Sequence, residues 1–236
     1  MMGHVISHAV DRAGVEGKEI DDVVIGSVLT AGTAGMNVAR LASLAAGLPI
    51  SVPAQTIDRQ CSSGLMAIGT AAKQIMVDGH DIAVAGGQEN ISAVQNEYFK
   101  WALDEKDENA EAHAEHVYMP MLQTAEHVAN TYGISREAQD EYAAFSQQRT
   151  AVAQQAGRLD DEIVPITATR AVKDKESGAI SYEDVTLERD EGNRPGTTVE
   201  RLGNLSPVIE GGSITAGNAC PLNDGAAAVI PRWLTT

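Results

Sequence analysis

Cys61 is the residue of this sequence that is best placed for covalent chemistry. It lies where a β-compatible run, 52–57, and a polar corner give way to a helical pattern that begins at Ser62. The first N–H groups of a helix lack partners and carry partial positive charge, so a thiolate placed there is stabilised. The thiolate is the nucleophilic form of cysteine. We therefore predict a nucleophile at Cys61, against the alternative that a free cysteine is a small buried apolar side chain.

Three other kinds of residue invite a chemical interpretation. His113 and His116 lie three apart and could pair as metal ligands on a helix, but no third ligand accompanies them, so a solvated loop without metal is favoured. Arg170, Lys173 and Lys175 form a basic cluster that could meet phosphates, although a solvated charged turn is the simpler interpretation. Two cysteines in this chain form no disulfide framework, which favours the reducing cytosol.

The elements that would position Cys61 alternate between helices and strands. We expect helices at 4–13, after Asn37 as a cap, and from Ser62 to Gly79, with strands at 23–29, 52–57 and 82–85. This alternation predicts a layered α/β sheet. The Gly86-Gly87 pair follows a strand without a phosphate-binding spacing, and it is interpreted as a tight turn.

The sequence changes character after Ser92. The stretch 104–116 is acidic and is expected to be exposed. Two helices are predicted at 122–132 and 135–156, the second capped by Ser135, followed by strand-like pieces at 163–166 and 180–187. An apolar stripe on the second of these helices is expected to face the core; it consists of Ala138, Tyr142, Phe145 and Val152.

Composition excludes several classes of protein. The net charge of −16 argues against nucleic acid or an anionic membrane as a partner. The sequence has no run of about 18 apolar residues and no signal peptide, so we expect a cytoplasmic protein that does not span a membrane. Aromatic residues make up only 4% of the chain, which suits an α/β protein with close packing of helices on a sheet.

Three stretches together resemble the thiolase family. They are Asp58-Arg59-Gln60-Cys61-Ser62-Ser63-Gly64-Leu65, then Val84-Ala85-Gly86-Gly87-Gln88-Glu89-Asn90-Ile91-Ser92, and finally the run from Ile214 to Ala228, ITAGNACPLNDGAAA. They occur in the family's order and at roughly the family's separations. The resemblance implies a layered α-β-α fold of the N-terminal half, with residues 1–92 as the core, 93–212 as an inserted loop domain, and 213–236 returning to the core.

The resemblance also implies an activity. Thiolases transfer acyl groups between 3-ketoacyl-CoA or acetyl-CoA and coenzyme A through an acyl-cysteine, as in fatty acid metabolism, and coenzyme A is then a substrate. By this resemblance Cys61 is the acylated nucleophile. Cys220 stands where the family commonly has a serine that contacts the pantetheine arm. Tyr118 and Met119 occupy the part that lines the family's acyl pocket, with a core stripe under the loop domain as the alternative.

Some features of the family have no counterpart in the sequence. The family's base, in a Gly-His-Pro motif, and its second cysteine, in a Cys-x-Gly motif, are not matched, and the tail from Pro231 departs from the family pattern. We therefore expect a truncated thiolase that is inactive alone, and a homodimer or homotetramer for the complete protein. A non-catalytic remnant of the fold is the alternative, and a β-ketoacyl synthase relative is a weaker one.

Overall fold

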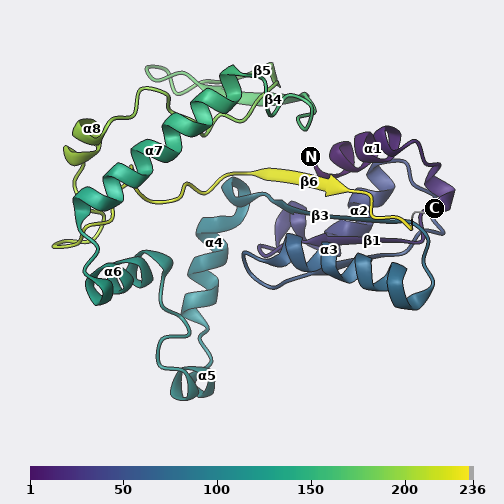
Figure 1. Cartoon of the computed structure of the whole chain (residues 1–236), viewed down its shortest axis with the longest axis horizontal. Coiled ribbons are helices and arrows are strands. Elements are labelled where there is room, and N and C mark those ends of the chain that lie inside the picture. The colour runs from purple at the N-terminus through teal and green to yellow at the C-terminus, as the bar shows by residue number, and fades with distance from the viewer. Residues whose placement is uncertain (234–236) are drawn as a thin grey trace. The chain divides into compact units, whose positions relative to one another are not determined.

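The chain divides into two compact units in a computed structural model that describes residues 1–233 (Figure 1). The first unit comprises Met1–Trp101 and the chain from Asn223 onward, and the second comprises Ala102–Leu222. The boundaries predicted from the sequence, at 92/93 and 212/213, lie about ten residues earlier. A continuous helix, α4 (Ile91–Asp104), spans both the predicted position 92/93 and the division between Trp101 and Ala102.

The first unit is built on a four-stranded sheet. Its order is β2–β1–β3–β6, with the strands at Asp22–Gly26 (β1), Ala54–Ile57 (β2), Ala83–Glu89 (β3) and Gly225–Val229 (β6). Strand β1 pairs in parallel with β2 and β3, whereas β6 runs antiparallel to β3. The three parallel strands therefore end at one edge of the sheet, which is where open α/β sheets bind their ligands.

Helices cover both faces of this sheet. Successive residues of a strand point to opposite faces, and accordingly Val23 and Ile25 pack with α1 (Met2–Ala13) and α2 (Val38–Ala45), while Val24 packs with α3 (Ser63–Lys73). Figure 1 shows α1 and α3 on opposite sides of the strands. The three-layer α-β-α architecture predicted from the sequence is confirmed.

The predicted helix ends of this unit are confirmed by their caps. Gly14 ends α1 in the left-handed region, and the side chain of Asn37 accepts a hydrogen bond from the Arg40 N–H at the start of α2. Helix α3 continues into a π-helical turn, Gln74–Asp78, which Gly79 ends with a φ of 82°.

Two expectations for the strands are wrong. Gly86-Gly87 is not a turn but the middle of β3, where Gly86 pairs with Ala228 and Gly87 with Ala227. A Cβ atom at Gly86 would lie 3.0 Å from the Cα of Ala228, so a glycine there allows β6 to approach. Strand β1 ends at Gly26 rather than at residue 29.

The second unit is mainly helical with a separate hairpin. Its helices are α5 (Glu108–His113), α6 (Met121–Tyr132), α7 (Arg136–Gln155) and α8 (Val199–Gly203), and its strands are β4 (Ile166–Lys173) and β5 (Ile180–Leu187). Ser135 caps α7 as predicted, by accepting from the Ala138 N–H. The stretch 104–116 is exposed as expected, but α5 replaces the expected loop, with the Asp107 side chain as its cap.

The apolar stripe predicted for α7 does not face the core. Tyr142, Phe145 and Val152 are 76%, 54% and 59% exposed, and Ala138 is exposed as well. The buried residues of the helix are Asp140, Ala144 and Ala151. The inward face of α7 carries the buried carboxylate of Asp140 and small residues. Apolar periodicity therefore predicted the wrong face of the helix.

The tail from Pro231 continues the sheet as far as the structure describes it. The Pro231 carbonyl accepts from the Ala83 N–H at 3.0 Å, and the Trp233 N–H donates to the Asp81 carbonyl at 3.0 Å. Residues 234–236 of this predicted atypical tail lie outside the described residues. Within residues 1–233, no helix is both long enough and apolar enough to cross a membrane.

Candidate active site

Cys61 lies in a tight corner between β2 and α3, and its side chain is exposed. The corner is closed by two backbone hydrogen bonds. The Ser62 N–H donates to the Arg59 carbonyl at 3.2 Å, and the Ser63 N–H donates to the Gln60 carbonyl at 3.0 Å. Cys61 therefore stands immediately before Ser62, the N-cap of α3, as the sequence predicts.

Side chains of residues 58–63 also stabilise the corner through hydrogen bonds to its backbone. Asp58 Oδ1 accepts from the Gln60 N–H at 2.7 Å. Ser63 Oγ accepts from the Arg59 N–H at 2.8 Å and donates to the Gln60 carbonyl at 2.6 Å. Gln60 has a φ of 50°, which is unfavourable for a residue with a side chain. Strained backbone of this kind persists where its surroundings hold it, and it is concentrated at functional sites.

Two glycines, Gly26 and Gly87, lie directly beneath the corner. A Cβ atom at Gly26, the last residue of β1, would lie 2.5 Å from the backbone nitrogen of Gly64, and one at Gly87 of β3 would lie 3.2 Å from the Gly64 Cα. The start of α3 therefore rests directly on the backbone of two strands. Any side chain at Gly26 would have to displace it.

The corner modifies the expected source of thiolate stabilisation. The N–H groups of Ser62 and Ser63 are already used within the turn, so they are not free donors for the Cys61 sulfur. What remains is the field of α3 and the N–H groups that follow.

Sequence reasoning overlooked two polar residues beside this corner. The Glu89 carboxylate accepts hydrogen bonds from the N–H groups of Val28 and, at 3.2 Å, Leu29. The buried Gln88 side chain donates to Ser27 Oγ at 3.0 Å. Together they fix the loop that leaves β1 at the same sheet edge as Cys61. The signal in the sequence is a polar pair directly after the apolar run of β3.

Tyr118 and Met119 lie together in the second unit. Both line an open pocket of about 450 Å³, with Leu103, Lys106 and Pro120 among their neighbours. Tyr118 Oη accepts from the Asp107 N–H at 3.0 Å, and the Lys106 ammonium lies 5.5 Å from the centre of the tyrosine ring. The pocket walls therefore combine apolar side chains with charges of both signs, because Glu111 and Glu115 line the pocket as well and Lys106 pairs with Glu111 at 3.6 Å.

Cys220, the third predicted binding residue, is exposed and does not line that pocket. Its Sγ lies 3.5 Å from the Pro221 carbonyl oxygen. Since Cys61 belongs to the first unit and Tyr118, Met119 and Cys220 belong to the second, a shared role in one reaction stays a prediction.

The basic cluster is part of the β4–β5 hairpin. Arg170 donates through Nε to Glu183 Oε1 at 3.1 Å and pairs with the same oxygen through its terminal nitrogen. This cation is therefore already neutralised on an exposed hairpin. Arg170 and Lys173 lie in strand β4, and only Lys175 lies in the expected charged turn. Within residues 1–233, no three or more histidine, cysteine, aspartate or glutamate side chains are grouped to hold a metal ion.

Comparison with known proteins matches this chain to one family. The model of the family described as "Thiolase, N-terminal domain" matches residues 1–232. An acetyl-CoA acetyltransferase of Cupriavidus necator is 43% identical over 237 residues, covering 96% of this chain and 58% of the relative. A 3-ketoacyl-CoA thiolase of Bacillus subtilis is 40% identical over 230 residues, covering 95% of this chain and 57% of the relative.

A solved structure shows the same likeness in three dimensions. The crystal structure of the Bacillus anthracis acetyl-CoA acetyltransferase superposes with a TM-score of 0.75 at 37% identity, covering 96% of this chain and 57% of that one. The chain thus spans a little over half the length of the relatives it matches. By the extent of the family match and by its fold, the chain belongs to the thiolase family.

Proposed function

We propose that this chain carries the acyl-accepting half of a thiolase reaction, in which Cys61 takes an acyl group from a 3-ketoacyl-CoA or from acetyl-CoA. The observation that carries the proposal is the geometry of the Cys61 corner. An exposed sulfur stands before a helix, on a strained turn seated on glycine backbone at the carboxyl edge of parallel strands. The names of the relatives, acetyl-CoA acetyltransferase and 3-ketoacyl-CoA thiolase, support the same chemistry.

The reaction balances as two acyl transfers. The Cys61 sulfur attacks the 3-keto carbon of a 3-ketoacyl-CoA, the bond between C2 and C3 breaks, and the acetyl-CoA carbanion takes a proton. The thiol of a second coenzyme A then attacks the Cys61 thioester, releasing a shortened acyl-CoA and regenerating the cysteine. In the synthetic direction, the Cys61 thioester is attacked instead by an acetyl-CoA carbanion.

Both steps require proton transfer, and we propose that the groups responsible are not among these 236 residues. No stretch of the chain matches the family's Gly-His-Pro or Cys-x-Gly motifs. General acid–base assistance typically contributes about 10²- to 10⁴-fold to a rate. The chain is therefore expected to form the Cys61 thioester slowly and not to complete rapid cycles alone. The exposed sulfur and strained corner favour this function over a fold that only binds coenzyme A.

The pocket of Tyr118 and Met119 is our candidate for receiving the acyl group, and Cys220 our candidate contact for the pantetheine arm. We further propose a cytoplasmic protein of fatty acid metabolism.

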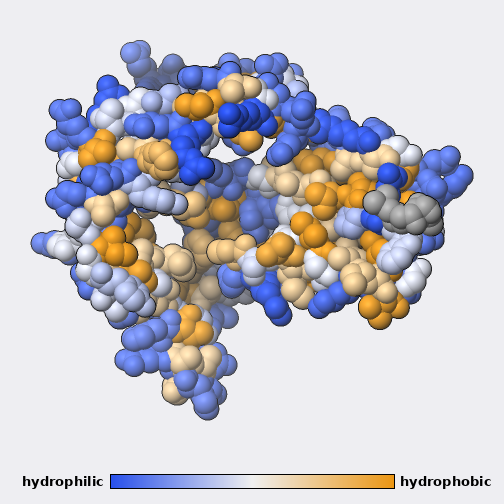
Figure 2. Space-filling view, in the orientation of Figure 1, coloured by the Kyte–Doolittle hydropathy of each residue, from blue (hydrophilic) through white to orange (hydrophobic). Residues whose placement is uncertain are grey.

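Self-association is part of the same proposal. Strand β2 is an edge strand of the sheet, and an unpaired edge can bind another strand. Large apolar side chains are also exposed on α3 and its π-helical turn: Leu65 at 74%, Met76 at 73% and Val77 at 77%. Figure 2 shows apolar residues at several places on the visible face of the first unit. Such surface commonly marks protein contacts, and we propose a homodimer or homotetramer.

The test is direct detection of the thioester. The chain is incubated with acetoacetyl-CoA for hours, quenched in acid and digested, and the peptides are examined by mass spectrometry. An acetyl group, the fragment that contains the 3-keto carbon, is expected on Cys61. It should be absent from a Cys61→Ser variant and unchanged in Cys220→Ser. Acylation confined to Cys220, or acylation that survives Cys61→Ser, would overturn the assignment.

A further inference from the structure

The Ser213–Asn218 turn has no regular secondary structure, but side chains of α6 and α7 form hydrogen bonds with it. From α6, the Glu126 carboxylate accepts the N–H groups of Ser213 and Ile214 at 2.8 Å and 2.7 Å. It also accepts from Ser213 Oγ at 3.0 Å, and that hydroxyl accepts in turn from the Gln139 side chain on α7 at 2.9 Å. One end of the turn is therefore tied to α6 and α7.

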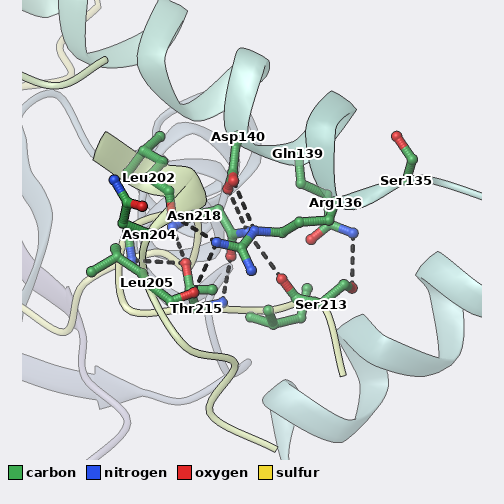
Figure 3. A network of polar contacts seen from close by, with 12 residues as sticks. Ser135, Arg136, Gln139, Asp140, Leu202, Asn204, Leu205, Ser213, Thr215 and Asn218 are labelled. Atoms are coloured by element: carbon green, nitrogen blue, oxygen red, sulfur yellow. Dashed lines mark hydrogen bonds and ion pairs between the residues drawn. The ribbon is translucent and has the colours of Figure 1, made fainter. Parts of the chain in front are cut away.

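The other end is tied to α7 through Asp140, whose exposed fraction is only 2% (Figure 3). Asp140 Oδ1 accepts from the Asn218 side-chain nitrogen at 2.9 Å, and the same nitrogen donates to the Ser213 carbonyl at 3.2 Å. Asn218 Oδ1 accepts from the Thr215 N–H at 2.7 Å. Asn218 thus closes the turn on itself and fastens it to the buried carboxylate.

Arg136 supplies the charge that Asp140 needs. Its Nε lies 2.7 Å from Asp140 Oδ2, and its terminal nitrogen donates to the Leu202 and Leu205 carbonyls at 2.7 Å and 3.0 Å, at the C-terminal end of α8. A buried carboxylate is tolerated only when it is paired and hydrogen-bonded. The arrangement joins α7, α8 and the turn into one network.

The turn is also packed so that it has little freedom of its own. Thr215 is fully buried, and its hydroxyl accepts from the N–H groups of Gly217 and Asn218 at 3.2 Å and 3.3 Å. A Cβ atom at Gly217 would lie 2.5 Å from Leu202 Cδ2 and 2.6 Å from Leu205 Cδ1. Hydrogen bonds and close packing therefore specify the same conformation.

We propose that Glu126 and Asp140 are positioning residues for the acyl-CoA site: they hold the Ser213–Asn218 turn so that Cys220, two residues beyond it, meets the pantetheine arm. This inference rests on the proposed function. Burying ion pairs contributes little net stability compared with apolar packing, whereas a buried polar network specifies a single arrangement where its groups are paired. Here the carboxylates of Glu126 and Asp140 are paired, and Gln139 Oε1 is a buried atom of the network without a partner among the described residues. A binding segment without regular structure needs such support from surrounding side chains.

The charge state of Glu126 agrees with this role. The pKa of Glu126 is lowered from its ordinary value of 4.5, chiefly by the hydrogen bond from the Ile214 N–H. Burial acts in the opposite direction, and the hydrogen bonds from Ser213 lower the pKa further. The carboxylate form is thus the one that the turn requires. Glutamine would keep one acceptor oxygen for the two N–H groups but lose the negative charge, and its NH₂ group would face the Ser213 hydroxyl.

The test measures how well desulfo-coenzyme A, which has no thiol of its own, protects Cys220 from a thiol reagent. The variants are Glu126→Gln and Asp140→Asn. Asp174→Asn is the matched control, because Asp174 likewise accepts N–H groups, those of Glu176 and Ser177, but in the β4–β5 hairpin. Circular dichroism and the labelling rate of Cys61 in the same molecules report whether the fold is kept.

We expect at least tenfold more desulfo-coenzyme A to be needed for half-protection of Cys220 in Glu126→Gln and Asp140→Asn, and no change in Asp174→Asn. If both variants lose the fold, Ser213→Ala takes their place, because it keeps the two N–H bonds to Glu126. It should need two- to fivefold more desulfo-coenzyme A for half-protection of Cys220. Protection equal to wild type in folded variants overturns the proposal. So does an unprotected Cys220 in the wild type, whereas acylation of Cys61 tests the proposed function separately.

Discussion

Gly26 acts at the residue scale by lacking a side chain. The backbone of Ser63 and Gly64 occupies the space that its Cβ would fill, so the position of the Cys61 corner depends on a residue that makes no polar contact with it. Gly69, in the middle of α3, provides a contrast, because nothing lies within 4 Å of where its Cβ would be. The two glycines separate the effect of a clash from the effect of helix propensity.

Gly26→Ala is predicted to destabilise the protein by about 1–3 kcal/mol through overpacking and to change the labelling rate of Cys61. Gly69→Ala is predicted to stabilise it by roughly 0.5–1 kcal/mol, because alanine favours a helix interior. Urea denaturation of both variants, with timed labelling of Cys61, checks these expectations. A Gly26→Ala protein as stable as wild type would show that the corner can move away without cost.

Cys61 is predicted to react with iodoacetamide faster than Cys220 near neutral pH. Both thiols are exposed, so access does not separate them, whereas only Cys61 stands directly before a helix of 11 residues. Mass spectrometry of the two peptides after brief labelling measures the ratio. Equal or reversed rates in a folded sample would remove the argument that α3 activates the sulfur.

The Glu126 carboxylate predicts a defined pH dependence of stability. Because its pKa is lowered in the fold, its contribution is fully present above its ordinary value of 4.5 and is lost as pH falls through the lower folded value. The stability difference between wild type and Glu126→Gln should therefore be largest near neutral pH and should shrink below pH 4.5. Urea denaturation across that range tests it, and a difference that widens in acid would contradict the cause assigned here.

At the scale of elements, α7 shows what determines which face of a helix is buried. Asp140 and the small residues Ala144 and Ala151 face inward, whereas Tyr142 and Phe145 face solvent. Phe145 is covered partly by Arg149, whose guanidinium lies 5.4 Å from the ring centre. The network of Arg136 and Asp140 could not be read from hydrophobic periodicity, because its partners come from α8 and from the Ser213–Asn218 turn.

Phe145→Ala is therefore predicted to cost less than about 1 kcal/mol, compared with about 3–5 kcal/mol for a phenylalanine in a core. Ala144→Leu, on the inward face, is predicted to cost about 1–3 kcal/mol or more. Denaturation midpoints of the two variants decide between the two orientations. A large loss from Phe145→Ala would mean that the apolar stripe is covered in solution, for example by another copy of the chain.

The same contrast explains what could be predicted elsewhere. Local signals predicted the caps at Asn37 and Ser135 and the place of Cys61, because a cap or a strand-to-helix corner depends on a few adjacent residues. The extended conformation of Gly86-Gly87 was mispredicted, because it depends on pairing with β6, far along the sequence. Glu89 was overlooked for the same reason, since its partners Val28 and Leu29 lie some 60 residues earlier.

At the scale of the whole molecule, the purified chain is predicted to show no measurable thiolysis of acetoacetyl-CoA. Cys61 has its place, but no stretch matches the family's base or its second cysteine. Losing such assistance costs about 10²- to 10⁴-fold for each step, and groups that act as a unit are not additive. The measurement is CoA-dependent loss of acetoacetyl-CoA absorbance beside a Cys61→Ala control. Robust turnover abolished by Cys61→Ala would reveal an unidentified base in this chain.

The first unit is made of two stretches of the chain that are separated by the second unit. This order affects folding during synthesis. Strand β6, which pairs with β3, is synthesised only after the whole of the second unit, Ala102–Leu222. At about 5–20 residues per second, the edge of β3 leaves the ribosome on the order of ten seconds before its partner. Throughout that interval Gly86 and Gly87 present bare backbone on the side of β3 that faces away from β1 and that β6 later covers. Until β6 is made, the nascent chain therefore carries an open sheet edge, and such an edge can pair with another molecule.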